Sequence, residues 1–167
     1  MNAQTLESSL ELPLGVLPNV GLAPNQLDLL RELENFEAPY LEEKLLSNRA
    51  FESPQEYQKA FKEFKRFAFL ANLYSGNLGM VGKKIDEVWH QFILFTPQYH
   101  KFCEEMFSKY LHHQPKTSYT PLSQSGKKSF FRLYKQTFGE LPRIWGRTDE
   151  SECCRLCDGA SCSGCDS

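Results

Sequence analysis

The sequence lacks any apolar run that approaches the ~20 residues needed to cross a bilayer. Its N-terminus has no basic segment followed by a hydrophobic stretch, so a secretory signal peptide is not expected. The chain also lacks a glycine-rich phosphate loop, a dinucleotide-binding fingerprint and a nucleophile elbow, which mark several large enzyme classes. These absences argue against a membrane protein and favour a cytoplasmic location, where thiols stay reduced.

The sequence also lacks a large excess of one charge sign, because 19 basic and 21 acidic residues give a formal net charge of −2. The basic residues concentrate between positions 57 and 135, but no nucleic-acid-binding motif occurs among them. Neither a nucleic acid nor a membrane surface is therefore the expected partner. Another protein is expected, and the sequence leaves the oligomeric state open.

Alternation of apolar and polar residues, the pattern of paired strands, is absent as well. Apolar residues instead recur every three or four positions along most of the chain. The sequence predicts an all-α fold, a compact bundle of five or six helices. Three regions are expected: an irregular N-terminal arm over 1–24, an α-helical domain over 25–146 and a cysteine-rich tail over 147–167.

One helix start is marked with particular clarity. Ser53, Pro54 and Glu56 have the order of a capping serine, a first-turn proline and a capping glutamate. The helix that follows is expected to bury a stripe of aromatic residues. Four basic side chains are expected to lie off that stripe: Lys59, Lys62, Lys65 and Arg66.

Other boundaries follow from similar signals. Asn25 is a candidate N-cap for the first helix of the domain. Thr96 and Pro97 predict the start of a helix that is expected to run to about His112 and His113. Gly139 is expected to end the last helix.

What the sequence does contain is cysteine, concentrated at one end. Five of the six cysteines form two C-x-x-C units and one adjacent thiol in the tail: Cys153, Cys154, Cys157, Cys162 and Cys165. Four thiolates can satisfy a tetrahedral zinc ion, and ligation can order a segment that has too few apolar residues to fold alone. Zinc is the expected cofactor, with Cu(I) or an Fe–S cluster as alternatives. Redox chemistry of the thiols and a tail without a defined role also remain open.

A second candidate site lies in the helical region. Asp86 and His90 are four residues apart, so they share a helical face and the carboxylate can orient the imidazole. A metal site that joins this pair to Cys103, His112 or His113 requires the chain to fold back on itself. The alternative is structural, with Cys103 in the core and the two adjacent histidines capping a helix C-terminus.

Several segments resemble the glycine-rich domain-containing protein family, known from plants and from smaller bacterial relatives. The similar segments are Ile85–His90, Phe92–Tyr99, Phe102–Cys103, Leu111–Pro115 and Phe138–Trp145, within about residues 55–147. The resemblance implies a compact α-helical domain of unknown function, often followed by a Gly- or Cys-rich tail. It implies no established activity.

Three functions are compatible with these patterns. The favoured one is a small helical binding or interaction module whose C-terminal thiolates bind a metal. The first alternative is a metal-dependent or acid/base enzyme with its site at Asp86, His90, His112 and His113. The second is a carrier of a modified or redox-active cysteine-rich tail.

Overall fold

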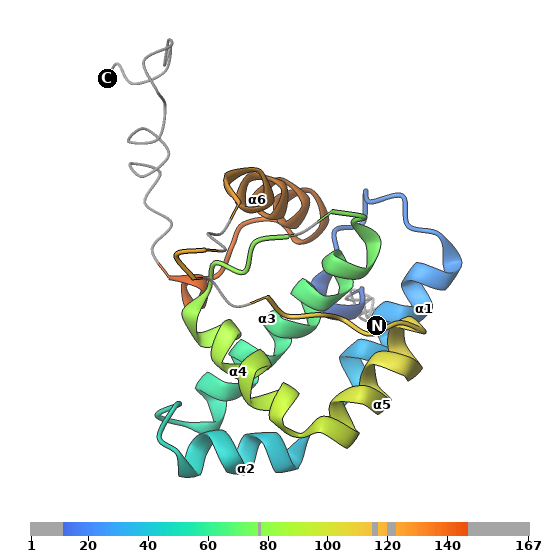
Figure 1. Cartoon of the computed structure of the whole chain (residues 1–167). Helices are drawn as coiled ribbons and strands as arrows, with labels where there is room; N and C mark the ends of the chain where they lie inside the picture. Colours follow the sequence, from blue (N-terminus) through green and yellow to red (C-terminus); the bar gives the residue numbers. More distant parts are fainter. Residues whose placement is uncertain (1–11, 77, 115–116, 120–122, 147–167) are drawn as a thin grey trace, which may run out of the picture.

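The computed structural model describes residues 12–76, 78–114, 117–119 and 123–146, and within them the fold is all-α, as predicted. Six α-helices and two short 3-10 helices follow one another along this described part of the chain (Figure 1). They are η1 (Pro13–Gly15), α1 (Pro24–Asn35), α2 (Pro39–Ser47), α3 (Pro54–Leu73), α4 (Lys83–Leu94), α5 (Thr96–Phe107), α6 (Gln124–Phe138) and η2 (Arg143–Trp145). None of the described helices combines the length and apolar character that a membrane crossing requires.

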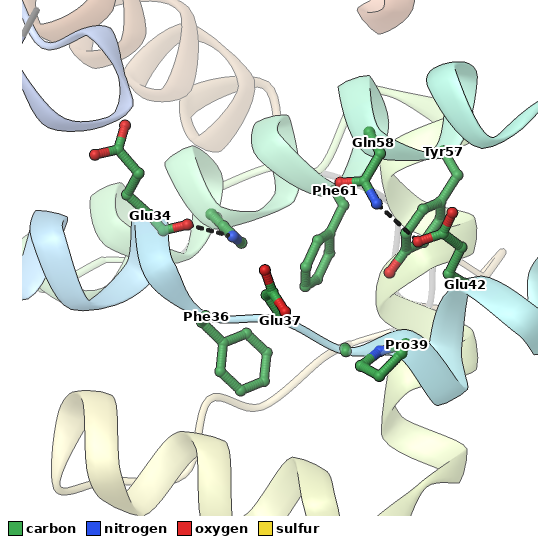
Figure 2. Close-up of a pocket in the computed structure, with 10 residues that line it drawn as sticks. Glu34, Phe36, Glu37, Pro39, Glu42, Tyr57, Gln58 and Phe61 are labelled. Atoms are coloured by element: carbon green, nitrogen blue, oxygen red, sulfur yellow. Dashed lines mark hydrogen bonds between the residues drawn. The ribbon is translucent and has the colours of Figure 1, made fainter.

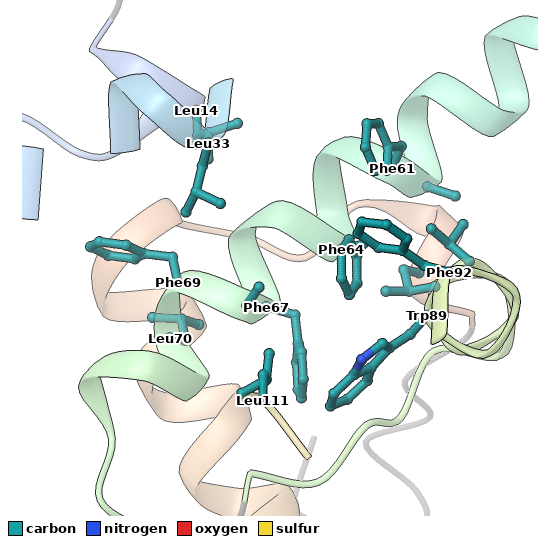
Figure 3. Packing of buried hydrophobic residues seen from close by; sticks show 14 of the residues in the cluster. Leu14, Leu33, Phe61, Phe64, Phe67, Phe69, Leu70, Trp89, Phe92 and Leu111 are labelled. Carbon is teal, nitrogen blue, oxygen red and sulfur yellow. The ribbon is translucent and has the colours of Figure 1, made fainter. Parts of the chain in front are cut away.

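Helix α3 is the central element, with α1, α2, α4 and α6 all packed against it. Its start confirms the sequence signal, because the Ser53 hydroxyl accepts a hydrogen bond from the Glu56 backbone N–H at 3.2 Å. Phe64 and Phe67 of α3 lie against Trp89, with ring centroids 6.1 and 5.3 Å apart (Figure 3). Burying each such aromatic side chain contributes roughly 1.5–3 kcal/mol. The core therefore fixes the position of α4, which carries Trp89.

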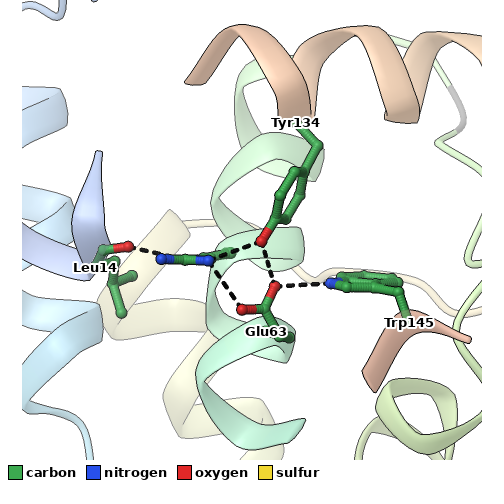
Figure 4. A network of polar contacts seen from close by, with 5 residues as sticks. Leu14, Glu63, Tyr134 and Trp145 are labelled. Atoms are coloured by element: carbon green, nitrogen blue, oxygen red, sulfur yellow. Dashed lines mark hydrogen bonds and ion pairs between the residues drawn. The ribbon is translucent and has the colours of Figure 1, made fainter. Parts of the chain in front are cut away.

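The prediction that Lys65 and Arg66 lie off the buried stripe of α3 is wrong. Both are buried, and Glu63 on the same helix is only 3% exposed. Arg66 Nη1 donates to Glu63 Oε1 at 2.9 Å and to the Tyr134 hydroxyl at 2.7 Å (Figure 4). Trp145 Nε1 donates to Glu63 Oε2 at 2.7 Å, and Tyr134 donates to the same oxygen. Charge is tolerated here because it is paired and hydrogen-bonded.

The N-terminal arm joins this network through η1. Arg66 Nε donates to the Leu14 carbonyl at 2.8 Å, and the Leu14 N–H donates to Glu34 Oε1 of α1 at 2.9 Å. Leu14 and Val16 are buried in the main core. From Leu12 onward the arm is thus packed against the domain.

Helix α1 begins differently from the prediction that placed a cap at Asn25. Pro24 occupies the first helical position, and Ala23 is the N-cap. The Gln26 side chain accepts a hydrogen bond from the Ala23 N–H at 2.8 Å. The end of α6 does follow the prediction, because Gly139 is its C-cap with a φ of 86° that a glycine adopts without strain.

Helix α5 is shorter than predicted, and this difference shapes the site described below. The helix ends at Phe107, because Ser108 adopts a left-handed conformation with φ of 53° and its N–H closes on Glu104. The following segment returns across the molecule toward α4 (Figure 1). His112 and His113 lie in this segment and not at a helix C-terminus, so the capping role expected for them is wrong.

Candidate metal centre

The first two residues of the candidate centre lie on α4, as the sequence predicted. Asp86 and His90 are one helical turn apart, and His90 Nδ1 is 3.5 Å from Asp86 Oδ2. Their side chains are 34% and 46% exposed, so the pair is open to solvent on one side. Packing of Ile85 and Trp89 into the core sets which face of α4 turns outward.

His113 completes a cluster of three potential ligands. Its Nε2 atom lies 2.8 Å from Asp86 Oδ1, and its ring centroid is 4.4 Å from that of His90. The His113 side chain is only 7% exposed. One potential ligand atom from each residue lies within 4.8 Å of the others. The return of the chain after α5 therefore brings together residues that are 27 positions apart.

A chain of buried hydrogen bonds places the His113 segment. Trp89 Nε1 donates to the Tyr99 hydroxyl at 2.8 Å, and Tyr99 donates to the Leu111 carbonyl. Burial raises the pKa of Tyr99, so its hydroxyl stays protonated and remains a donor. The Trp89 ring also meets the His113 ring at 4.3 Å in an edge-to-face contact. Trp89 and Tyr99 thus act as positioning residues for His113.

The substitution Tyr99→Phe is expected to destabilise the protein by about 1–3 kcal/mol, because it leaves the Trp89 N–H and the Leu111 carbonyl buried without their partner. Urea denaturation followed by circular dichroism measures this loss. The control Tyr110→Phe removes an exposed hydroxyl and is expected to cost less than ~0.5 kcal/mol. Equal stability of the two variants would contradict the proposed hydrogen-bond chain.

Cys103 and His112, the other helical-region candidates, do not join the cluster. Cys103 is buried on α5, where burial raises the pKa of its thiol, and its neighbours there are Tyr99 and the Leu111 backbone. This placement agrees with the core role considered for it. His112 is exposed, and its ring lies 4.8 Å from that of Tyr110.

The five tail cysteines, Cys153, Cys154, Cys157, Cys162 and Cys165, lie outside the described residues, so the thiolate site stays a prediction. The point from which the tail leaves the domain is described. Trp145 packs on Gly82 at the start of α4, where an added Cβ would meet the indole Cε3 at 2.6 Å. The last described residues, up to Gly146, therefore lie near the first turn of the helix that carries Asp86.

The donor set defines what the cluster can bind. Imidazole nitrogen and carboxylate oxygen suit zinc and other divalent transition metals. Two donors on one tetrahedral ion lie roughly 3.3 Å apart, given bonds of about 2.0–2.1 Å. Asp86 Oδ1 lies 2.8 Å from His113 Nε2, and Asp86 Oδ2 lies 3.5 Å from His90 Nδ1, so these separations lie on either side of that distance. One ligand atom from each residue lies within 4.8 Å of the others, so the three donors would have to move closer together to share one ion.

Sequence reasoning found the Asp86–His90 pair from its spacing but left His113 as one of several candidates. No local signal could select His113, because its position depends on the end of α5 and on Tyr99, which contacts Leu111 across 12 positions. No role for Trp89 in positioning another residue was predicted from the sequence, although Trp89 lies in the Ile85–His90 segment of the resemblance.

Comparison with known proteins identifies the family. The profile of the UCP032817-like family matches residues 28–140, which include Asp86, His90 and His113. No curated protein and no solved structure matches the chain. The resemblance to glycine-rich domain-containing proteins was misleading, because the matched family is a different, uncharacterized one. Since the match extends over well more than half of the sequence, the chain belongs to the UCP032817-like family.

Proposed function

We propose that the helical domain is a metal-binding module that holds a divalent transition-metal ion, zinc first, at Asp86, His90 and His113. The observation that carries this proposal is the convergence of one carboxylate and two imidazoles within 4.8 Å. To bind an ion through Nε2, His113 would carry its proton on Nδ1, and its hydrogen bond to Asp86 would be replaced by the bonds of both residues to the metal.

The surroundings of the cluster support the proposal. His113 is held by Trp89 and the packed segment behind it, as the outer contacts of metal sites commonly hold a ligand. The exposed side of His90 provides an entry path for the ion. Three protein ligands also leave a coordination position for water or for a donor from a partner. The same ligands would suit a metal-dependent enzyme, but the proposal is restricted to binding.

The tail supplies a second, separate ligand set in this proposal. Its five thiols remain candidates for zinc, and a cytoplasmic location would keep them reduced. An interaction with another protein is part of the same hypothesis.

Metal content of the full chain separates the two sites. Four proteins are compared after reduction and dialysis against buffered zinc: the parent chain, His90→Ala/His113→Gln, a chain with all five tail cysteines changed to Ser, and the combination. The Ser variant is expected to retain zinc at the helical site, and the combined variant is expected to lose it. Mass spectrometry of the elements gives the ion content per chain.

Two matched controls, combined in one chain, keep the histidine count equal to that of His90→Ala/His113→Gln without touching the cluster. His100→Ala and His112→Ala remove exposed imidazoles outside the three-residue group and are expected to leave the zinc content unchanged. Zinc that disappears with the tail cysteines and persists in His90→Ala/His113→Gln would show that the helical site is wrong.

A further inference from the structure

A separate feature is a cavity of about 300 Å³ between α3 and the segment that joins α1 to α2 (Figure 2). Aromatic rings of Phe36 and Phe61 form part of its wall. Its polar lining includes Glu37, Glu42 and Lys65. The cavity shares no residue with the cluster of Asp86, His90 and His113, so an inference from it does not depend on the proposed metal site.

Tyr57 gives this cavity a polar group without a partner. Tyr57 lines the cavity and is only 1% exposed. Within the described part of the chain, its hydroxyl is a buried side-chain group that no hydrogen bond satisfies. Burial raises the pKa of Tyr57, and the charge of Glu42 acts in the same direction, so the hydroxyl is neutral. A buried hydroxyl without a partner costs free energy, and a ligand atom that hydrogen-bonds to it would remove that cost.

The charges around the cavity favour a cation. The Glu34 carboxylate is turned away and accepts from the Leu14 N–H, while Glu37 and Glu42 remain in the lining. Lys65 is a lining residue of the opposite charge, and its Nζ donates to the Glu34 carbonyl at 2.9 Å. Lining carboxylates thus outnumber the lysine. Figure 2 shows the Glu42 and Gln58 pair at the far side of Phe61 from the Glu34 carbonyl.

The alkylammonium group of Lys65 already lies against the aromatic wall of the cavity. Lys65 Nζ lies 4.7 Å from the centroid of the Phe61 ring, within the range of a cation–π interaction. Phe61 is in turn stacked on Tyr57 with an interplanar angle of 14°. Aromatic faces beside carboxylates are the usual surroundings of a bound organic ammonium ion.

We infer that this cavity binds a small primary alkyl amine in its ammonium form. Glu37 and Glu42 pair with the ammonium group, and the Tyr57 hydroxyl oxygen accepts one of its hydrogens. The carbon chain lies against Phe36 and Phe61. No covalent step is involved.

The charge of Lys65 makes this binding depend on pH. Burial lowers the pKa of Lys65 to about 8, although the charges of Glu34 and Glu37 oppose the shift. Glu42 and the neutral Tyr57 also line the cavity beside it. Loss of the Lys65 proton removes the like charge, whereas a free alkyl amine with a pKa near 10.5 stays charged. From pH 7 to pH 9 the neutral fraction of Lys65 rises from about a tenth to about nine tenths, so affinity should rise by up to about ninefold.

A nuclear magnetic resonance titration of the full, isotope-labelled chain with n-hexylamine tests the inference. Hexylamine is expected to shift the backbone signals of the cavity residues, whereas hexanol and hexanoate are not. Glu37→Gln and Glu42→Gln are each expected to weaken binding about fivefold. The matched control Glu43→Gln removes an exposed carboxylate from the next position of α2 and is expected to have no effect.

Lys65→Met is the most discriminating variant, because it should tighten hexylamine binding at pH 7 and make the affinity less dependent on pH. Its control, Lys62→Met, alters an exposed lysine of the same helix and should keep the profile of the parent. Tyr57→Phe should raise the melting temperature and weaken hexylamine binding. Preferential binding of hexanoate, loss of hexylamine binding in a folded Lys65→Met chain, equal binding of hexanol, or a flat pH profile in the parent would each overturn the inference.

Discussion

Replacing Glu63 by alanine is expected to lower the free energy of unfolding by about 3–5 kcal/mol, because it leaves a buried arginine without its counter-charge. The Glu63 carboxylate is 3% exposed and receives hydrogen bonds from Arg66, Tyr134 and Trp145. Burial raises the pKa of Tyr134, so this hydroxyl stays a donor that needs the carboxylate. Urea denaturation followed by circular dichroism and by tryptophan fluorescence measures the loss.

Two further variants separate the effect of the buried charge on stability from the effect of lost packing. The pair Glu63→Leu/Arg66→Met removes both charges and should lose less stability than Glu63→Ala alone, because replacing a whole buried pair costs less than breaking it. Glu105→Ala, at an exposed position of α5, should change stability by less than ~0.5 kcal/mol. A Glu63→Ala protein within ~1 kcal/mol of the parent would contradict the assigned role of the network.

The same network shows which feature of the core could not be predicted from the sequence, namely its buried charged residues. Helical periodicity located α3 and its aromatic stripe, since Tyr57, Phe61, Phe64 and Phe67 are all buried as predicted. Periodicity treats every lysine, arginine and glutamate as a solvent-facing residue. Arg66 lies on the same helix as Glu63, but the other two partners, Tyr134 and Trp145, are 71 and 82 positions away, and no local pattern indicates them.

The candidate metal centre, too, could be predicted only in part from the sequence. Asp86 and His90 belong to one helix, so their spacing alone placed them on one face. His113 reaches them only because Ser108 takes a left-handed conformation and ends α5, a conformation that is uncommon for a serine. With the longer helix that the sequence suggested, His113 would have continued along the axis of α5. The cluster therefore depends on the end of α5 at Ser108 as well as on the hydrogen bond from Tyr99 to the Leu111 carbonyl.

Zinc is expected to stabilise the chain in which all five tail cysteines are changed to serine. An ion that binds the folded state at a free concentration of 1,000 times its Kd adds about 4 kcal/mol to the free energy of unfolding. For a chain of 167 residues this corresponds to a rise in melting temperature on the order of 10 °C. Calorimetry at several buffered zinc concentrations measures the rise, and a chelator should reverse it.

Two histidine variants test whether this stabilisation comes from the cluster. His90→Ala removes a proposed ligand that is 46% exposed, so the metal-free protein should melt near the parent temperature while its response to zinc is lost. His112→Ala, one position from His113 but outside the cluster, should keep the full response. Because protons compete with a metal ion for imidazole nitrogens, the response should also weaken as pH falls. A zinc response that survives His90→Ala and does not weaken with falling pH would mean that Asp86 and His113 form only a hydrogen bond, and that zinc binds elsewhere on the chain.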